Sequence, residues 1–220
     1  FRDWLKEDSR LVIPRVHFAT KRVLVTDYCP GLPVNQLAGQ EQATRDAVVA
    51  ALLELTLKEL FHFRCMQTDP NWSNYLYDDS EGRLILLDFG ATREFPAEFV
   101  TRYGQLLRAA IAQDLPQVEA LSLQLGFLTG HETVAMREAH TQAILHLALP
   151  FSGGPYDFGV APSQVIQRVK GLIPTMLNYR LTPPPDESYS LHRKLSGLFL
   201  LATKLKARVD CQSLLTAILK

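Results

Sequence analysis

The sequence predicts an α+β fold in which a short β-hairpin precedes a larger, mostly helical region. Two runs rich in β-branched and aromatic residues, at 12–18 and 22–28, are separated by a short polar turn, as in a hairpin. The Pro- and Gly-containing residues 29–33 then interrupt regular structure, and most of the second half of the chain has the apolar spacing of helices. We therefore divide the chain into residues 1–28, the remnant of a small β-containing lobe, and residues 29–220, a helical lobe.

The remaining elements follow from local patterns. Residues 1–9 have the character of a helix end. Residues 44–61 form a helix whose apolar side chains cover most of its circumference and leave little beyond Glu54 and Lys58 for solvent, so we expect it inside the domain. Short strands are predicted at 75–77 and 84–87, and helices at 97–113, 115–125, 131–149, 163–179, 188–208 and 210–219, with loops around 153–155 and 183–185.

Composition excludes several classes of protein. With 23 basic and 23 acidic residues there is no overall field to attract nucleic acid, which we do not expect as a partner. Three cysteines, far apart and odd in number, argue against a disulfide framework or a zinc cluster and favour a reducing compartment. No apolar run is long enough to cross a bilayer, and the first residues carry no signal or targeting segment, so the chain as given is expected to be soluble.

Three oxygen-bearing side chains between Gln67 and Gly90 indicate a catalytic centre. Asp69 and Asn74 lie in one polar loop after the buried helix, and Asp88 ends the second following strand. This is the order of kinase catalytic machinery, in which phosphoryl transfer depends on positioning and charge neutralisation. The oxygens of Asn74 and Asp88 suit Mg²⁺, and Asp69 is placed to orient an attacking hydroxyl or water. The alternative is a polar loop in which Asp69 caps a turn and Asp88 merely ends a strand.

Two further segments belong to this interpretation. The connection after the second hairpin strand is similar to the kinase hinge, with Thr26 as gatekeeper and the backbone of Asp27 and Cys29 bonded to adenine; an ordinary linker is the alternative. A second Asp-Phe-Gly, at 157–159, has no apolar strand before it, and we interpret it as a turn.

The residue strings at the site resemble the UbiB family of atypical kinases, in particular its mitochondrial coenzyme Q branch. The strings that carry the resemblance are 66–74, 87–95, 127–130, 155–159 and 183–194, so it covers essentially the whole chain. The resemblance implies a protein-kinase-like fold that binds ATP and Mg²⁺. It also implies support of ubiquinone biosynthesis at the matrix face of the mitochondrial inner membrane, in association with other coenzyme Q biosynthetic proteins and near a membrane surface or a lipid ubiquinone precursor.

Departures from protein kinases refine the expected function. The helical pattern resumes near Ala97, which leaves no peptide platform, and Gln67, Thr68 and Asn71 replace the His-Arg and Lys of protein kinases. We therefore expect an ATPase or small-molecule kinase that does not phosphorylate proteins. No phosphate loop and no Lys–Glu pair precede the hairpin, so this stretch alone is expected to be inactive. The alternatives are a nucleotide-gated scaffold that organises coenzyme Q enzymes, and a small-molecule phosphotransferase.

Charged and reactive residues outside this centre have simpler interpretations. The last long helix is expected to expose a basic face to solvent, and docking of that face to an anionic membrane is the alternative. The histidines show no metal-ligand spacing and are interpreted as structural, with His192 noted for its place in a family-like string. Cys65 is expected to be a packed thiol. The expected basic face consists of Arg193, Lys194, Lys204 and Arg208.

Overall fold

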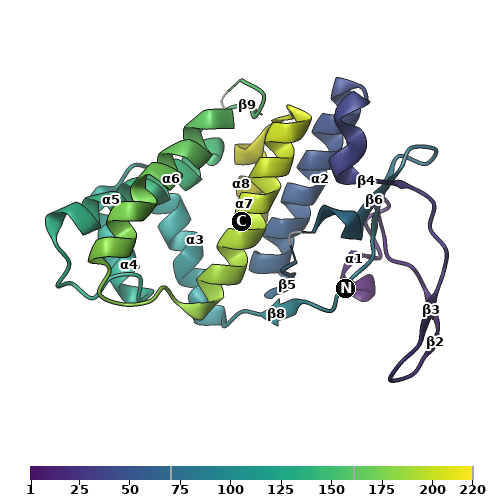
Figure 1. Ribbon diagram of the computed structural model, residues 1–220, viewed down its shortest axis with the longest axis horizontal. Coiled ribbons are helices and arrows are strands. Elements are labelled where there is room, and N and C mark those ends of the chain that lie inside the picture. Colours follow the sequence, from purple (N-terminus) through teal and green to yellow (C-terminus); the bar gives the residue numbers. More distant parts are fainter. Residues whose placement is uncertain (70, 161, 220) are drawn as a thin grey trace.

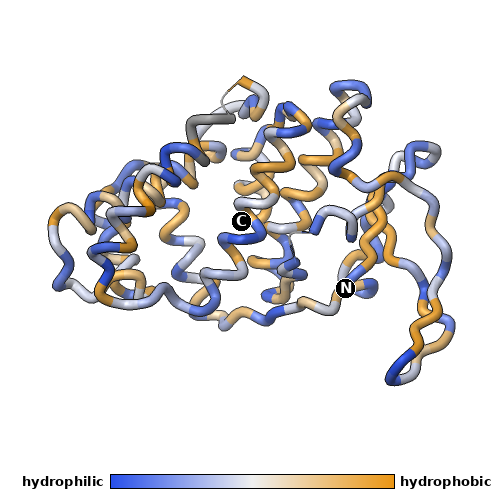
Figure 2. Tube along the Cα trace, in the orientation of Figure 1, coloured by the Kyte–Doolittle hydropathy of each residue, from blue (hydrophilic) through white to orange (hydrophobic). Residues whose placement is uncertain are grey.

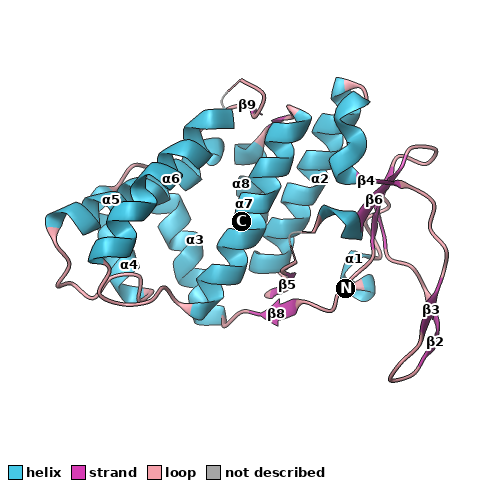
Figure 3. Ribbon diagram, in the orientation of Figure 1, coloured by secondary structure: helices cyan, strands magenta, loops and turns pink. Residues whose placement is uncertain are grey.

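The computed structural model describes residues 1–69, 71–160 and 162–219 and has the expected α+β architecture. Helices form the body of the molecule, and most strands gather at one end of it (Figures 1 and 3). None of the helices in the described part of the chain is both long and apolar enough to span a bilayer.

A small mixed sheet supports the segments that follow the hairpin. Its strand order is β1-β7-β6-β4, with β1 (Leu11–Val12) parallel to β7 (Arg83–Leu86). β6 (Tyr75–Asp78) is antiparallel to both β7 and β4 (Leu32–Pro33). The sequence predicted β6 and β7, and the structure confirms both. Three two-stranded ladders complete the β-structure: β2 (Val16–Ala19) with β3 (Leu24–Thr26), β5 (Cys65–Gln67) with β8 (Thr92–Glu94), and β9 (Tyr156–Asp157) with β10 (Arg208–Val209).

The helices lie close to their predicted positions. Caps account for several boundaries: α5 begins at Val134 and not at 131, because the Thr133 hydroxyl accepts a hydrogen bond from the amide of Met136. The described helices are α1 (Arg2–Leu5), η1 (Val34–Gly39), α2 (Gln42–Phe61), η2 (Trp72–Asn74), α3 (Ala97–Ile111), α4 (Leu115–Gln124), α5 (Val134–Ala148), η3 (Leu149–Phe151), α6 (Pro162–Tyr179), α7 (Asp186–Leu205) and α8 (Cys211–Ile218).

Two apolar clusters form the core. The first surrounds α2 and combines it with the sheet, α7 and α8, and the second lies between α3, α4 and their neighbours. Phe61, Leu107 and Ile111 pack against both clusters, so the two are continuous. The expected burial of α2 is confirmed, since ten of its residues are buried.

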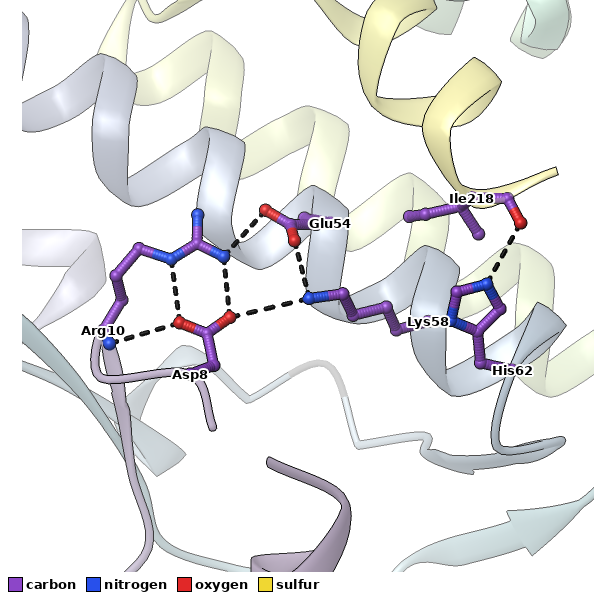
Figure 4. A network of polar contacts seen from close by, with 6 residues as sticks. All are labelled: Asp8, Arg10, Glu54, Lys58, His62 and Ile218. Carbon is purple, nitrogen blue, oxygen red and sulfur yellow. Dashed lines mark hydrogen bonds and ion pairs between the residues drawn. The ribbon is translucent and has the colours of Figure 1, made fainter. Parts of the chain in front are cut away.

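The sequence suggested that Glu54 and Lys58 face solvent. In the structure both side chains also form ion pairs. Figure 4 shows them in a charge network with Asp8 and Arg10 of the N-terminal segment. Arg10 Nη2 lies 2.6 Å from Asp8 Oδ2 and 2.8 Å from Glu54 Oε2, and Lys58 Nζ lies 2.6 Å from Glu54 Oε1. The Arg10 side chain lowers the pKa of Asp8 to about 2. The network fastens the N-terminal segment to α2, because the polar stripe of the helix faces that segment.

The β2–β3 hairpin extends away from the helical body (Figure 1). Its strands are apolar in Figure 2, yet their side chains are exposed: Phe18 is 57% and Leu24 is 67% accessible. Exposed apolar surface of this kind marks a contact face. The hairpin predicted from sequence is confirmed, although its strands are shorter than 12–18 and 22–28, because Leu11 and Val12 pair with β7 instead.

Candidate functional site

The loop between β5 and β6 brings Asp69 and Asn74 into contact. The Asn74 side chain donates a hydrogen bond from Nδ2 to Asp69 Oδ2 over 2.8 Å. Asp69 Oδ1 accepts from the amide of Asn71 at 3.2 Å, and Asn71 Oδ1 accepts from the amide of Ser73 at 3.1 Å. Asx turns of this kind hold an irregular backbone in one shape. Both Asp69 and Asn74 are half-buried, so they have support behind them and access in front.

Asp88 lies at the same end of the β6–β7 ladder as Asn74. In that ladder Tyr75 pairs with Leu86, and the register continues one step further because the amide of Leu87 donates to the carbonyl of Asn74 at 2.9 Å. Asp88 is the next residue. Directly opposed residues of an antiparallel pair are close neighbours. The structure therefore joins Asp69 to Asn74 by a hydrogen bond and places Asp88 one residue beyond Leu87, which bonds to Asn74, at the same edge of the sheet.

The free oxygens at this edge suit a magnesium ion that also binds phosphate. Because Asn74 donates its amide nitrogen to Asp69, its Oδ1 is left as an acceptor. Asp88 uses Oδ1 to accept from the amide of Gly90 at 2.8 Å, which leaves Oδ2. Mg²⁺ is commonly held by one or two protein oxygens together with substrate phosphates and water. Among the described residues no group of three or more His, Cys, Asp and Glu could hold a metal.

The predicted hinge residues lie in the exposed connection after β3. The Asp27 amide donates to the carbonyl of Arg15, and the Asp27 carboxylate binds His17 Nε2 at 2.5 Å. Among the described residues, the Asp27 carbonyl accepts from the neighbouring Thr26 hydroxyl and Cys29 thiol. That carbonyl remains an acceptor at an exposed edge. In the described part of the chain, the side chains of Thr26, Asp27 and Cys29 form no hydrogen bond or ion pair with Asp69, Asn74 or Asp88. The two segments are linked through the pairing of β4 with β6.

A buried polar network supports the loop between β5 and β6. It also shows that one residue of the expected basic face was wrongly predicted. Lys194 is not on a solvated face, since it is only 1% exposed. Its Nζ donates to Gln67 Oε1 at 3.0 Å and also to the hydroxyl of Tyr75, which in turn donates to Gln67 Oε1 at 2.8 Å. Glu59, likewise 1% exposed, accepts from the amide of Gln67 at 3.3 Å. The other three residues of the expected basic face, Arg193, Lys204 and Arg208, are exposed.

The network holds both ends of the loop between β5 and β6. Gln67 ends β5 and Tyr75 begins β6, so Lys194 of α7 joins the two residues that flank Asp69 and Asn74. Burial raises the pKa of Glu59 to about 7, although the Lys194 charge opposes the shift. Burial lowers the pKa of Lys194, and the Glu59 and Asp69 charges oppose that shift. The charge of each residue therefore favours the ionised form of the other, against the effect of burial.

Sequence patterns gave only a weak signal for this network. Glu59 falls within a helix that is apolar almost all round, and a charge at a buried helical position requires a partner. Its partner is more than a hundred residues away along the chain, so periodicity alone could not identify it. Gln67 was noted only because it replaces a kinase histidine.

The second Asp-Phe-Gly is a turn, as the sequence suggested. Asp157 Oδ1 accepts from the amides of Gly159 at 2.7 Å and Val160 at 3.2 Å, and its Oδ2 binds Arg208 Nε at 2.9 Å. Cys65 is half-buried, and burial raises the pKa of its thiol, in keeping with a packed side chain.

The fold is that of a kinase-like protein. In the Mycobacterium tuberculosis protein Rv3197, solved in complex with erythromycin, a matching region superposes with a TM-score of 0.73 at 18% sequence identity, covering 97% of this chain and 54% of that one. Residues 1–122 match the ABC1 atypical kinase-like domain. The chain belongs to the ABC1 atypical kinase family, and the resemblance deduced from its sequence motifs is confirmed.

Curated relatives extend this similarity beyond residue 122. The mitochondrial atypical kinase COQ8B of Danio rerio is 43% identical over 217 residues, which cover 97% of this chain and 34% of that protein. COQ8B of Rattus norvegicus is 44% identical, covering 97% and 41%. The mitochondrial atypical kinase COQ8 of Saccharomyces cerevisiae is 39% identical, covering 97% and 43%. The chain thus spans less than half the length of these relatives.

Proposed function

We propose that the protein is a Mg-ATP-binding atypical kinase or ATPase that supports ubiquinone biosynthesis. The proposal is supported by the hydrogen bond between Asn74 and Asp69 and by the β6–β7 register, which places Asp88 at the same end of the ladder as Asn74. A carboxylate beside an amide, with a second carboxylate adjacent, is the minimum that phosphoryl transfer needs for metal binding and orientation of the attacking group.

Each residue has a definite role in this proposal. Asn74 and Asp88 hold Mg²⁺ through the oxygens that the local turns leave free. Asp69 orients the attacking hydroxyl or water, held in place by the Asn74 amide. The Asp27 carbonyl and the Cys29 amide bind the adenine edge, and Thr26 lies behind it as gatekeeper.

We also propose that residues 1–28 belong to a smaller, nucleotide-covering lobe. The exposed apolar side chains of β2 and β3 support this, because they form a surface that a further sheet would bury. Contacts from such a lobe to the adenine and phosphates would raise nucleotide affinity above that of this chain alone.

The biological setting is proposed from the relatives. Several are named as mitochondrial atypical kinases, and we propose action at the matrix face of the inner membrane, together with coenzyme Q biosynthetic proteins. The helical segment α3 begins only a few residues after β8, which leaves no extended platform for a peptide. The proposed acceptor is therefore water or a small molecule and not a protein.

The test is Mg²⁺-dependent ATP hydrolysis by the full-length protein and its Asp69→Asn, Asp88→Asn and Asp79→Asn variants. Loss of a positioned general base lowers turnover by about 10²–10⁴, so we expect Asp69→Asn to lose turnover and retain Mg-ATP binding. Asp88→Asn should weaken Mg²⁺ binding. Asp79 is exposed in the β6–β7 turn, and its variant should behave as the wild type. Wild-type hydrolysis by Asp69→Asn would refute the proposal.

A nucleotide-gated scaffold is the second candidate, and the same variant separates the two. If binding without turnover organises partner enzymes, Asp69→Asn will restore ubiquinone synthesis in cells that lack the protein. If turnover is required, the Asp69→Asn variant will not restore ubiquinone synthesis.

A further inference from the structure

A pocket lies within the helical body, away from the proposed catalytic site. It has a volume of about 140 Å³ and is lined by side chains of α3, α5, α6 and α7 together with Phe127, Arg180 and Pro184. None of its lining residues belongs to the segment from Gln67 to Gly90 that carries the proposed catalytic site. An apolar cavity of roughly 150 Å³ accommodates a ligand the size of benzene. The pocket therefore has room for a body of about one six-membered ring.

Most of the wall is apolar, and one side of it is aromatic. Phe127 stacks on His192 with ring centroids 6.0 Å apart and an interplanar angle of 7°, and Tyr103 lies 6.0 Å from the same imidazole. Leu106, Ile144 and Met176 provide aliphatic surface. Flat rings and aliphatic carbons of this kind favour an apolar, ring-shaped ligand body.

The polar groups of the pocket come from three helices. Tyr103 and His192 bond to each other, with the hydroxyl 3.2 Å from Nε2, and His140 Nε2 lies 3.0 Å from the hydroxyl of Ser122. Burial lowers the pKa of both histidines to about 4, and the charge of Arg180 lowers them further. Both imidazoles are therefore neutral at pH 7, which leaves Arg180 as the one charged residue among those that line the pocket.

Arg180 has unused binding capacity. Its Nε is buried without a hydrogen-bond partner, and within the described ranges no carboxylate lies within ion-pairing distance of its guanidinium. The charge of Glu132 acts to raise the pKa of His140, but the Glu132 carboxylate already accepts hydrogen bonds from the amides of Thr129 and Gly130. A guanidinium is suited to bind a carboxylate through paired hydrogen bonds. Arg180 and His192 are half-buried, so this end of the pocket communicates with solvent.

We propose that this pocket is a binding site for a small amphipathic carboxylate, with the carboxylate on Arg180 and an apolar body of about one ring against Phe127 and His192. The site is separate from the nucleotide site, and its existence does not depend on the proposed function. Ligand size is limited by the cavity, and ligand charge is selected by the single cation at its polar end.

Benzoate and its uncharged counterpart benzyl alcohol are the probes, titrated into the full-length protein by calorimetry and ligand-observed NMR. We expect benzoate to bind with a Kd of about 1 mM or tighter, the range of a single-ring fragment. Arg180→Gln should weaken benzoate by roughly tenfold or more and leave benzyl alcohol unchanged. Arg168→Gln is the matched control and should change neither, because Arg168 is an exposed cation of α6, the helix that ends just before Arg180.

A second variant keeps the test decisive if Arg180→Gln does not fold. Ala143 is buried and lines the pocket, so Ala143→Leu should fill it and weaken both probes. Bound benzoate should also raise the pKa of His192, because it neutralises the charge on Arg180. The proposal is overturned if benzoate does not bind at about 10 mM, if a folded Arg180→Gln binds it as the wild type does, or if Ala143→Leu leaves binding unchanged.

Discussion

Lys194 and Glu59 are two buried side chains of opposite charge that both bond to Gln67, and the charge of each favours the ionised form of the other. Neither is more than 1% exposed. Removing one partner of such a pair leaves an uncompensated charge in the interior, which is more costly than losing the attraction itself. Removing both charges can leave the free energy of unfolding nearly unchanged.

Lys194→Met is therefore expected to lower the free energy of unfolding by about 3–5 kcal/mol, measured by urea denaturation. Glu59→Gln in the same molecule should recover most of that loss, because no buried charge then remains. Lys204→Met is the control on the same helix, since Lys204 is exposed, and should be close to neutral. A double variant as unstable as Lys194→Met would contradict this account.

His140 makes stability depend on pH in a definite direction. Burial lowers its pKa from 6.5 to about 4, so between these values the unfolded chain binds a proton that the folded chain does not. Stability therefore falls as the pH drops below 6.5. Glu59 acts oppositely: its raised pKa makes the folded state bind more protons between 4.5 and about 7, so that residue favours stability as pH falls.

The expected contribution of His140 is a loss of about 2 kcal/mol between pH 7 and pH 5, at 1.36 kcal/mol for each pH unit below 6.5. In His140→Asn this part of the pH dependence should disappear from urea denaturation curves. His131→Asn, an exposed histidine, serves as control and should keep the wild-type profile. An unchanged slope in His140→Asn would show that the imidazole is protonated in the folded state.

At the scale of elements, Gly31 decides how the hinge segment meets the sheet. A Cβ at this position would lie 2.9 Å from the carbonyl oxygen of Tyr77, which is closer than real Cβ contacts allow. The backbone of β4 can approach β6 only because residue 31 has no side chain. The loop that carries Asp69 and the proposed hinge are linked through this pairing.

Gly31→Ala should destabilise the protein by about 1–3 kcal/mol, the usual cost of overpacking, and should increase amide hydrogen exchange in β6. Gly39→Ala is the matched control: a Cβ there meets nothing within 4 Å, so it should be neutral or slightly stabilising. If Gly31→Ala exchanged like the wild type in β6, the close approach would not be essential.

Element prediction from sequence succeeded where periodicity or caps were long enough to recognise. Helix α2 and the helices from α3 to α8 lie within a few residues of their predicted ranges, because apolar spacing over three or more turns is a strong signal. The β5–β8 and β9–β10 ladders were missed. Strands of two or three residues carry too few alternations to be recognised, and their pairing depends on segments distant in sequence.

At the scale of the whole molecule, the C-terminal helix completes the core around α2. Cys211, Leu215 and Ile218 of α8 are buried in the same cluster as α2 and α7. His62 at the end of α2 bonds the carbonyl of Ile218 at 3.0 Å (Figure 4). Because the two clusters are continuous, loss of α8 should affect the entire molecule.

A variant that ends at Asp210 is expected to lose the single cooperative transition in calorimetry, along with its near-ultraviolet circular dichroism, because buried surface of α2 becomes exposed. A variant lacking only the last residue, Lys220, is the control and should unfold as the wild type does. Retention of a wild-type melting temperature after removal of α8 would show that the core is complete without it.

The sequence by itself determined the fold class, the long helices, the hairpin and the family, and it supplied the prediction of three candidate site residues. These rest on local periodicity and on short ordered strings, which are properties of neighbouring residues. Only the tertiary structure decided that Lys194 is buried beside Glu59, that Glu54 and Lys58 bind the N-terminal segment, and that Arg180 faces an apolar pocket. Burial and charge pairing depend on contacts between residues far apart in the chain, and helical periodicity does not record which helix lies opposite.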